Sequence, residues 1–502
     1  MGHPSVYPTG VTVYDVKRAW NGYTVFPSVR GALLIDMNGN EVNRWAGLGG
    51  FPNKILPGGY VLGNTGSRKG SRAYQDQLDL IQADWDGNVV WTFDHTELVS
   101  DGDNKDGNKE QWQARQHHDY QREGSPTGYY APGQAPETLS GNTLILVHEN
   151  VKNPDISEHE LIDDKVIEVT WDGDIIWEWK ASDHFGEFGF SDAAKAVLRE
   201  NPGIVGEAGG DWMHINSLSA VGANKHYDAG DERFHPDNLI MDARNSNILF
   251  IVSKKTGEIV WRLGPDFDTD ESVKKIGWII GQHHFHLIPK GLPGEGDFLV
   301  FDNGGAGGYG APNPASLDGR NNAVRDYSRV LQFDPLTLEI KWQYTPLEAG
   351  NILFTDASKF YSSYISSAQR LPNGNTLITE GSDGRLIEVT EEHEIVWEYI
   401  NPYYYDIGGK FHMNMIYRAY RVPYDWVPVP ESERNEEIAI APVDVSAWRL
   451  PGASAGEGTG KVTAVNGADP NRRCLVGMSD PSEEKGGGKS ADFCMVRITL
   501  DE

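Results

Sequence analysis

The sequence is short of cysteine and of long apolar runs. Its 502 residues include two cysteines, Cys474 and Cys494, which excludes a disulfide scaffold and a cysteine-rich metal motif and leaves one late disulfide open. No stretch approaches the roughly 18 apolar residues of a membrane-spanning helix. The first residues, MGHPSVYPTG, lack the basic and apolar segments of a secretory signal. We therefore expect no membrane span, and this sequence by itself favours a cytoplasmic location.

Basic charge is also scarce. The chain has 44 Lys and Arg against 73 Asp and Glu, which gives a formal charge of −29. Such a protein repels phosphate backbones and anionic lipids, so that nucleic acid is not expected as a partner. If the substrate is an anion, cationic groups must be gathered locally around it. The charge says nothing about the oligomeric state.

What the chain has in abundance is glycine, with 57 residues, and regularly placed tryptophan. One pattern occurs six times: an alternating apolar strand, a turn, and a second strand that ends in Trp. The copies lie at 33–45, 80–91, 166–177, 249–261, 330–342 and 386–397. In the first four copies a glycine occupies the turn, as hairpin turns with positive φ require. Further strand patterns lie at 56–63, 140–147, 237–244, 296–304 and 371–381.

This repeat predicts an all-β fold, a six-bladed β-propeller with about four strands in each blade. We expect the propeller over residues 1–428 and an irregular C-terminal extension over 429–502. The sixth copy lacks its second turn, so that a strand from one terminus, either 11–16 or 492–500, is expected to complete that blade. Loop-like inserts are expected at 95–135, 181–210, 219–236 and 304–328, and loops on a rigid scaffold often carry function.

Histidines recur in the segments that we expect to form inner strands, which line the channel of a propeller. These segments are 116–121, 212–218, 281–287 and 411–417, whereas the equivalent segment 362–369 has none. A step of two residues keeps two side chains on one face of a strand. The predicted cluster is therefore His118 (preferred to His117), His214, His284 and His412, with Asn216, His286 and Asn414 two positions after the last three.

Such a cluster can do two kinds of work. Neutral imidazoles can hold Zn, Mn or Fe, with His118, His214, His284 and His412 as ligands. Imidazolium and amide groups can instead stabilise the oxygens of sulfate or phosphate. Arg244, Arg329, Arg370 and Arg418 lie near the expected inner strands, where any of them could steer a negative group. Arg244, Arg329 and Tyr364 are the candidate substrate-binding residues.

A linked series of motifs resembles the bacterial arylsulfotransferases that use no nucleotide sulfate donor. The motifs are DWMHINSL (211–218), the segment 242–264, GQHHFHL (281–287), FLVFDNG (298–304) and YSRVLQFD (327–334), and the similarity runs over about residues 10–425. The resemblance implies a six-bladed propeller, a site in the central channel, no cofactor, and transfer of a sulfuryl group between phenols. Because the family is usually exported, it also implies a periplasmic location.

The resemblance further implies residue roles. In the family one histidine is transiently sulfated, while other His, Asn and Arg residues hold the sulfate. The histidine of the HxNS motif is His214, and that of the Gln-His motif is His283 or His284, with His286 in the place of an Asn. The sequence departs from the family at two points. TEGSDGRL (379–386) lacks the nucleophilic His, and DNGGAGG (302–308) lacks an Arg.

These departures favour a relative with remodelled chemistry. We expect His214, His284, His412 and His286 as catalytic residues, with His284 or His412 as nucleophile or base. The expected substrate-binding residues are Asn216, Asn414, Arg244, Arg329 and Tyr364. The expected substrate is a small aromatic molecule, phenolic and in some cases anionic.

Several functions stay open at this stage. The first is an arylsulfotransferase-like enzyme, and the second is a lyase, hydrolase or oxygenase that depends on one divalent transition metal. A third is a non-catalytic scaffold whose large inserts contact a partner. A quinone-cofactor dehydrogenase, which TGEIVW (256–261) resembles, is disfavoured because those propellers usually have eight blades.

Overall fold

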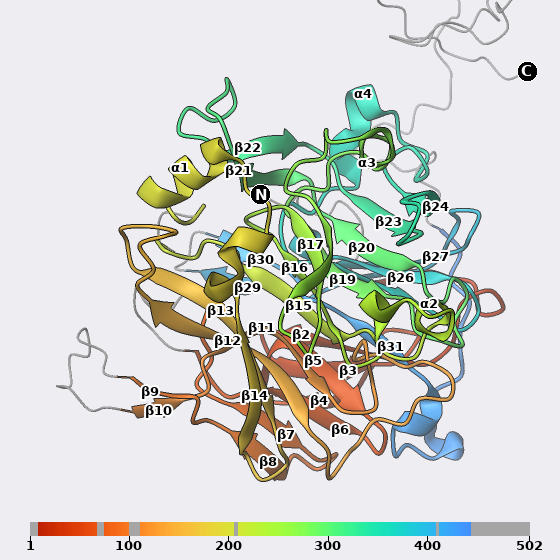
Figure 1. The fold of residues 1–502 in the computed structure, drawn as a ribbon. Coiled ribbons are helices and arrows are strands. Elements are labelled where there is room, and N and C mark those ends of the chain that lie inside the picture. The colour runs from red at the N-terminus through yellow and green to blue at the C-terminus, as the bar shows by residue number, and fades with distance from the viewer. Residues whose placement is uncertain (1–8, 68–74, 100–110, 205–208, 408–410, 443–502) are drawn as a thin grey trace, which may run out of the picture. The chain divides into compact units, whose positions relative to one another are not determined.

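The computed structural model describes residues 9–67, 75–99, 111–204, 209–407 and 411–442. In this part of the chain antiparallel strands dominate, and they form six blades around a central axis (Figure 1). The predicted all-β six-bladed propeller is therefore confirmed. Among these residues no helix is long and apolar enough to cross a membrane.

Each blade is a meander whose first strand lies nearest the axis. Blade 1 consists of β31 (Tyr420–Val422), β2 (Tyr23–Ser28), β3 (Gly31–Ile35) and β4 (Glu41–Trp45). Blade 2 consists of β5 (Gly49–Leu56), β6 (Tyr60–Asn64), β7 (Leu80–Ala83) and β8 (Val89–Phe93). Blade 3 consists of β11 (Gln116–Arg122), β12 (Thr143–Val151), β13 (Leu161–Val169) and β14 (Ile175–Lys180). Blade 4 consists of β15 (Ile215–Ala220), β16 (Leu239–Ala243), β17 (Ile248–Val252) and β18 (Ile259–Leu263). Blade 5 consists of β19 (His283–Leu287), β20 (Phe298–Asp302), β23 (Arg329–Phe333) and β24 (Ile340–Tyr344). Blade 6 consists of β25 (Ser367–Arg370), β26 (Thr376–Glu380), β27 (Arg385–Val389), β28 (Ile395–Ile400) and β1 (Gly10–Tyr14).

The connections between the blades contain short elements of their own. Three hairpins are formed by β9 (Glu97–Val99) with β10 (Gln111–Gln113), β21 (Gly305–Tyr309) with β22 (Arg320–Arg325), and β29 (Tyr405–Ile407) with β30 (Phe411–Met413). The helices are α1 (Asp192–Glu200), α2 (Lys225–Asp228), α3 (Glu271–Ile276), α4 (Leu353–Asp356), η1 (Ala181–Glu187), η2 (Glu232–Phe234), η3 (Ala357–Lys359), η4 (Gly381–Asp383), η5 (Tyr424–Trp426) and η6 (Glu431–Glu433).

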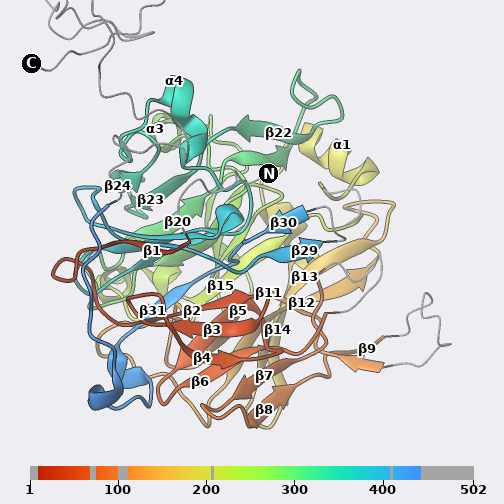
Figure 2. The ribbon, with the colours of Figure 1, turned by 180° about the vertical axis from the view of Figure 1, so that it is seen from behind.

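The ring is closed by a strand from late in the chain. β31 pairs with β2, with Val422 opposite Tyr23 and Tyr420 opposite Val25 (Figure 2). The junction with blade 6 is held by Gln369 and Arg421, whose side-chain and backbone groups exchange two hydrogen bonds of 2.8 Å. Blade 1 is therefore built from the two distant ends of the propeller sequence.

The expected terminal strand also joins the last blade. β1, which covers most of segment 11–16, pairs with β28 and becomes the fifth, outermost strand of blade 6. The second candidate strand, 492–500, lies outside the described residues. Of the expected extension, residues 429–442 are described, and Ile440 exchanges two backbone hydrogen bonds with Tyr14 of β1.

The repeated tryptophans connect each blade to the next. Each indole lies on the fourth strand of its blade and donates its Nε1–H to a carbonyl at the turn between the third and fourth strands of the following blade. The bonds run from Trp45 to Asp84 (2.8 Å), Trp91 to Trp171 (2.9 Å), Trp177 to Lys254 (3.1 Å), Trp261 to Pro335 (3.0 Å), Trp342 to Glu391 (3.0 Å) and Trp397 to Met37 (2.8 Å). A large apolar ring with one polar N–H suits this position, because it packs and bonds at once.

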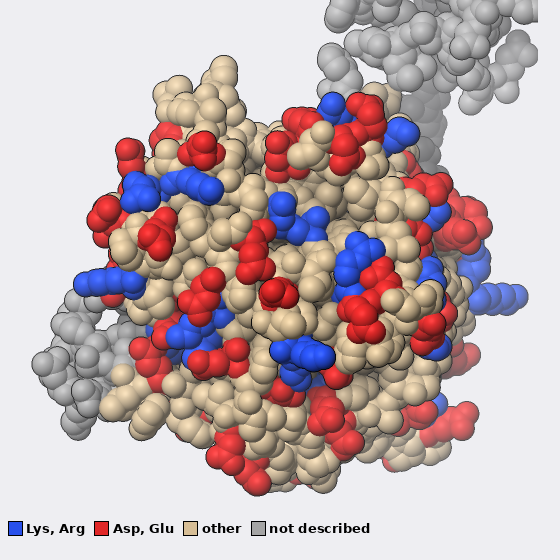
Figure 3. All heavy atoms as spheres, in the orientation of Figure 1, with Lys and Arg blue, Asp and Glu red and all other residues tan. Residues whose placement is uncertain are grey.

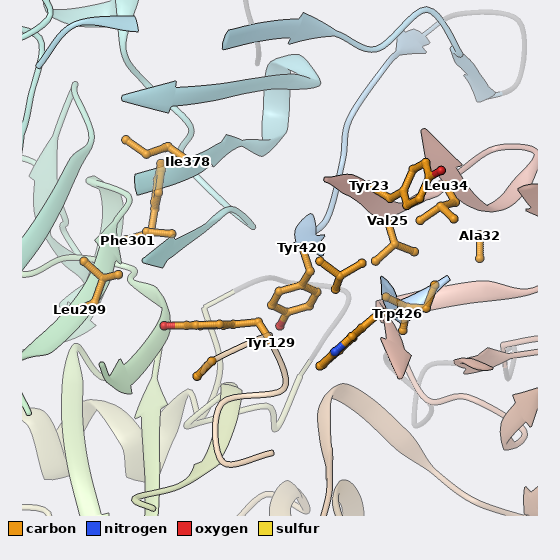
Figure 4. Packing of buried hydrophobic residues seen from close by; sticks show 14 of the residues in the cluster. Tyr23, Val25, Ala32, Leu34, Tyr129, Leu299, Phe301, Ile378, Tyr420 and Trp426 are labelled. Carbon is orange, nitrogen blue, oxygen red and sulfur yellow. The ribbon is translucent and has the colours of Figure 1, made fainter. Parts of the chain in front are cut away.

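Apolar packing fills one end of the channel. Tyr129, in the connection after β11 of blade 3, reaches across to Tyr420 of blade 1, with 6.3 Å between the ring centroids (Figure 4). It also reaches blade 5, where its hydroxyl lies 2.9 Å from Nε2 of His286. Both tyrosines are buried in a cluster that includes Leu299 and Phe301. Functional side chains are therefore to be sought toward the other end, where the inner strands begin.

Candidate active site in the central channel

Strand pairing sets one residue of each of three blades at the same level of the channel. Tyr120, Leu218 and Ala368 pair with Ile145, Met241 and Ile378, which occupy equivalent places on the second strands. The residues two positions earlier are His118, Asn216 and Ser366. In blade 5 the equivalent place is held by Val300, which lies opposite the bulge that contains His284 and Phe285. Phe51 of β5 and Tyr417 complete the circle: Phe51 lies 5.5 Å from His118 and 4.8 Å from Tyr417 between ring centroids.

This register corrects one prediction. Asn216, and not His214, is level with His118. The inner strands contain β-bulges here, so that counting residues along them does not preserve the register. His214 lies two residues nearer the end of the channel where the strands begin. We call that end the channel mouth and define it by His214, Arg244 and Tyr364.

Backbone conformation marks the same histidines. His118, His214 and His284 have φ values of 51°, 54° and 56°, in the left-handed region that residues other than glycine rarely adopt. Strain of this kind persists only where the surroundings impose it, and it is concentrated at functional sites. Three strained histidines on three neighbouring blades therefore point to this channel as the site.

His214 forms a carboxylate–imidazole pair at the channel mouth. Its Nδ1 lies 2.6 Å from Oδ2 of the buried Asp211. The Nδ1–H tautomer that this bond favours leaves the lone pair on Nε2, as in the histidines of hydrolase triads. His214 is 8% exposed, against 2% for His118 and 1% for His284. It is thus the channel histidine that solvent reaches most.

Two neighbours complete the mouth. The ring of His118 lies 4.4 Å from that of His214 in an edge-on arrangement. The backbone N–H of Arg244 donates to the carbonyl of His214 at 3.1 Å, and the Arg244 side chain is half-buried. Burial, followed by the charge of Arg244, lowers the pKa of His283 well below its usual range. Arg244 is therefore a cation beside the channel histidines.

The adjacent residues His283 and His284 differ completely in their surroundings. His283 is tied to its neighbours: Nδ1 lies 2.7 Å from Oδ1 of Asn303, and Nε2 accepts the backbone N–H of Ile365 at 3.1 Å. Both ring nitrogens of His284 are buried without a hydrogen-bond partner. Burial, followed by the charges of Arg418, His286 and Lys54, lowers the pKa of His284, so that it stays neutral. The His of the Gln-His motif that is available for chemistry is thus His284.

Next to His284 lies a buried group of charges, in which Arg418, a candidate from the sequence, joins two residues that the sequence did not mark. Lys54 Nζ is 2.7 Å from Asp119 Oδ1, and Arg418 donates to Asp119 Oδ2 at 2.8 Å. All three side chains are at most 4% exposed. Burial alone would raise the pKa of Asp119, but Lys54 and Arg418 outweigh it and lower the pKa. Two cations to one carboxylate leave this part of the channel positive inside an acidic protein.

The structure places several predicted residues outside the cluster. His412 lies exposed on the hairpin of β29 and β30, because the strand that closes the ring is 420–422 and not 411–417. The prediction that His412 faces the channel from an inner strand is therefore wrong. Asn414 exchanges hydrogen bonds of 2.8 and 3.0 Å with Asn401, also away from the ring.

Other predicted residues have structural partners. Arg329 donates to Asp302 Oδ2 at 2.8 Å and to two carbonyls, which holds it within blade 5. His286 is buried against Tyr129, and burial lowers its pKa to about 3. Asn216 donates to the carbonyl of Gln282 at 2.9 Å, while its Oδ1 is buried without a partner. Tyr364 is half-buried in the segment leading to β25.

The predicted metal ligands His118, His214, His284 and His412 are not gathered around one point, because His412 lies on a separate hairpin. In the described part of the chain, the set with metal-binding spacing is His117, His148 and Asp164. His148 lies outside the segments that the sequence marked as inner strands. Its only signal was its place at the end of an unusually long second strand, β12, facing the equally long β13.

The fold and the site together define a six-bladed propeller with a candidate active site in its central channel. The channel carries strained histidines, a carboxylate–histidine pair and buried cations. This chain belongs to the arylsulfotransferase (ASST) family, whose model matches residues 81–402. That is well over half of the chain, so the resemblance drawn from the motifs is confirmed. Membership supports a transferase of the arylsulfotransferase kind.

No curated protein matches the chain. Among solved structures it is similar to a protein of unknown function from Bacteroides caccae, with 11% identity, 80% of this chain and 99% of that chain covered, and a TM-score of 0.40. It is also similar to a putative 6-phosphogluconolactonase from Bacteroides fragilis, with 10% identity, 84% and 100% covered, and a TM-score of 0.32. These distant likenesses carry no argument about function.

Proposed function

We propose that this protein transfers a sulfuryl group from an aryl sulfate to a phenol at the channel mouth, with His214 as the nucleophile. The observation that carries the proposal is the Asp211–His214 pair, held at 2.6 Å on the most exposed of the channel histidines and next to Arg244. His284, which the sequence favoured, has two unpartnered nitrogens but is almost fully buried. It suits a role in binding better than one in attack.

The reaction would proceed in two displacements. Nε2 of His214 attacks the sulfur, a nitrogen–sulfur bond forms, and the bond from sulfur to the aryl oxygen breaks to release a phenolate. Asp211 stabilises the positive charge that develops on the imidazole. The acceptor phenol then attacks the sulfur and the nitrogen–sulfur bond breaks. The proton that this phenol loses balances the proton that the first phenolate takes up.

The local charge supports an anionic substrate. The protein as a whole carries −29, which would repel a sulfate ester. Lys54 and Arg418 share one carboxylate, Asp119, and burial raises the pKa of the neighbouring Asp242 to about 7, so that the channel interior carries a local excess of positive charge. Arg244 adds a cation at the mouth. Charges in a water-poor channel act more strongly than on the surface, because little solvent screens them.

The packing also supports a nucleophile at a new position. The family resemblance locates its nucleophile in the segment that reads TEGSDGRL (379–386) here. At Gly381 a Cβ atom would lie 2.4 Å from the carbonyl oxygen of Ile416, which leaves no space for a side chain. The chain that leads to β31 therefore occupies this region, and the channel histidine that remains accessible is His214.

The test is turnover of 4-nitrophenyl sulfate with phenol as acceptor, followed by release of nitrophenolate. Intact-mass and peptide analysis of enzyme mixed with donor alone should find one added SO₃ group on His214. His214→Asn should lower kcat by about 10³-fold or more, and Asp211→Asn by about 10²-fold or more, because it disturbs the tautomer.

The matched control is His95→Gln. His95 also has a carboxylate neighbour, Asp94 at 3.0 Å, but is exposed at the edge of blade 2. It should turn over the substrate like the wild type. Full activity of His214→Asn, or an SO₃ adduct on His284, would contradict the assignment of the nucleophile. No turnover of any aryl sulfate by the wild type would contradict the proposed function itself.

A further inference from the structure

Blade 3 contains a group of ligand-type side chains that the proposed reaction does not use. His117 lies on β11, His148 on β12 and Asp164 on β13, three neighbouring strands of one sheet. His148 and Asp164 are direct cross-strand partners, and His117 is next to Gln116, which pairs with Val147. All three side chains have no exposed surface.

Their inward-facing atoms converge. His117 Nε2 lies 3.5 Å and His148 Nε2 lies 3.9 Å from Oδ1 of Asp164. The two imidazole rings are stacked with centroids 3.5 Å apart and planes 12° apart, so both present the same edge to the carboxylate. These separations are too long for good hydrogen bonds. They approach the roughly 3.4 Å that separates two ligands held about 2.1 Å from one tetrahedral ion.

Both convergent imidazole nitrogens lack partners. His117 Nε2 and His148 Nε2 are buried without a hydrogen bond, whereas the facing Asp164 Oδ1 accepts the backbone N–H of Ile215 at 3.1 Å and Asp164 Oδ2 has no partner. Buried polar atoms are nearly always satisfied, so that two unpartnered nitrogens facing a carboxylate require an explanation. A bound cation would satisfy both nitrogens and the carboxylate.

The outer nitrogen of each ring has a polar neighbour, and in His148 this neighbour is the carboxylate that metal-binding histidines often have. His148 Nδ1 lies 2.6 Å from Oδ1 of the buried Asp76, whose Oδ2 accepts from Arg115 Nε at 2.8 Å. His117 Nδ1 lies 2.8 Å from His118 Nδ1. A carboxylate on the outer nitrogen orients the ring and leaves Nε2 for the metal.

We propose that blade 3 binds one divalent transition metal ion, zinc by preference, through His117 Nε2, His148 Nε2 and Asp164. Two imidazoles and one carboxylate suit zinc, and iron(II) can take the same set. The ion is distinct from the reacting group at His214. Because the site is closed to solvent and spans β11, β12 and β13, the ion holds these strands together and fixes the backbone of the adjacent His118.

The first measurement is the metal content of the full-length, untagged protein from a zinc-supplemented culture. We expect one zinc per chain, and iron in its place would support the same site. His148→Gln and Asp164→Asn should each reduce bound metal at least about tenfold, because loss of one of three ligands removes much of the affinity. The control is His226→Gln, which removes another buried histidine, bonded to the carbonyl of Gly296, and should keep its metal.

A second measurement covers variants that fail to fold. Wild-type protein is stripped with a chelator and titrated with Co²⁺, which should give d–d absorption bands that saturate at one ion per chain and a rise in Tm. Wild-type protein that contains no metal and shows no such bands overturns the proposal, as do variants that keep full metal. His214→Asn should keep its metal, so that failure of the proposed reaction and failure of this site can be told apart.

Discussion

The buried charges of the channel show what single residues contribute. Lys54, Asp119 and Arg418 come from blades 2, 3 and 1, and they meet where no water screens them. Asp119 also accepts the backbone N–H of Leu218 from blade 4 at 3.1 Å. One carboxylate therefore joins four blades. Removing one partner of such a group costs more than the group contributes as a whole, since the remaining charges stay buried.

Asp119→Asn should accordingly destabilise the protein strongly. Lys54 and Arg418 would face each other without a counter-charge, and we expect a loss of about 3–5 kcal/mol in the free energy of unfolding, measured by urea denaturation. The comparison is Asp228→Asn, which breaks an exposed pair with Lys290 at 3.0 Å and should cost less than about 1 kcal/mol. Equal effects of the two substitutions would refute the role of Asp119.

At the scale of elements, β19 stands out because it holds three buried histidines, His283, His284 and His286. Burial lowers the pKa of each, and that of His286 to about 3. As the pH falls below about 6.5, the ordinary pKa of histidine, the unfolded chain takes up protons that the folded chain refuses. The stability from these neutral histidines is thus complete above that pH and decreases as the pH falls toward 3.

His286→Gln should therefore flatten the acid side of the stability profile. The pH values 6 and 4 lie between the ordinary pKa of histidine, about 6.5, and the pKa of about 3 in the folded protein. Over this interval the free energy of unfolding of the wild type should fall by about 1.4 kcal/mol per pH unit more than that of the variant. Urea denaturation at several pH values measures this slope. His95→Gln, on the exposed surface, should retain the wild-type slope, and an unchanged slope for His286→Gln would show that His286 takes up its proton in the folded state.

The same elements show how far the sequence could lead. The six copies predicted the blades because a glycine turn and an alternating pair of strands are determined locally. His412 was misplaced because the alternating segment 411–417 resembles an inner strand, yet residues 411–413 pair with β29 instead. Alternation shows which side chains share a face, but it does not show which strand lies alongside.

The missed residues have a related cause. His117, His148 and Asp164 are separated in the sequence and meet only through the pairing of three strands. Lys54, Asp119 and Arg418 come from three different blades. No local pattern contains either group. The part of the candidate site that lies in one motif, DWMHINSL with Asp211 and His214, could be predicted from the sequence. The parts whose residues come together only when the ring closes could not.

At the scale of the whole molecule, charge is distributed very differently outside and inside. Acidic and basic side chains are interspersed over the face in Figure 3, with no single field of one sign on that face. The positive group of Lys54 and Arg418 is enclosed in the channel. Two buried cations thus lie inside a chain whose formal charge is −29.

The tryptophan bonds predict how the blades depend on one another. Trp261→Phe removes the 3.0 Å bond to the carbonyl of Pro335 and leaves a small gap between blades 4 and 5. We expect a loss of about 1–3 kcal/mol in the free energy of unfolding, with a single transition retained. Trp112→Phe on the exposed strand β10 should have no measurable effect. A second unfolding transition in the Trp261 variant would show that the blades unfold separately.

The pairing of β2 with β31 has a consequence for synthesis on the ribosome. The two strands lie about 400 residues apart, and a ribosome adding roughly 5–20 residues per second needs about 20–80 s to cover that distance. Throughout that time blade 1 has an open inner edge, which is the kind of surface on which chains aggregate. The last strand of the ring thus sets the period during which the inner edge of blade 1 stays exposed.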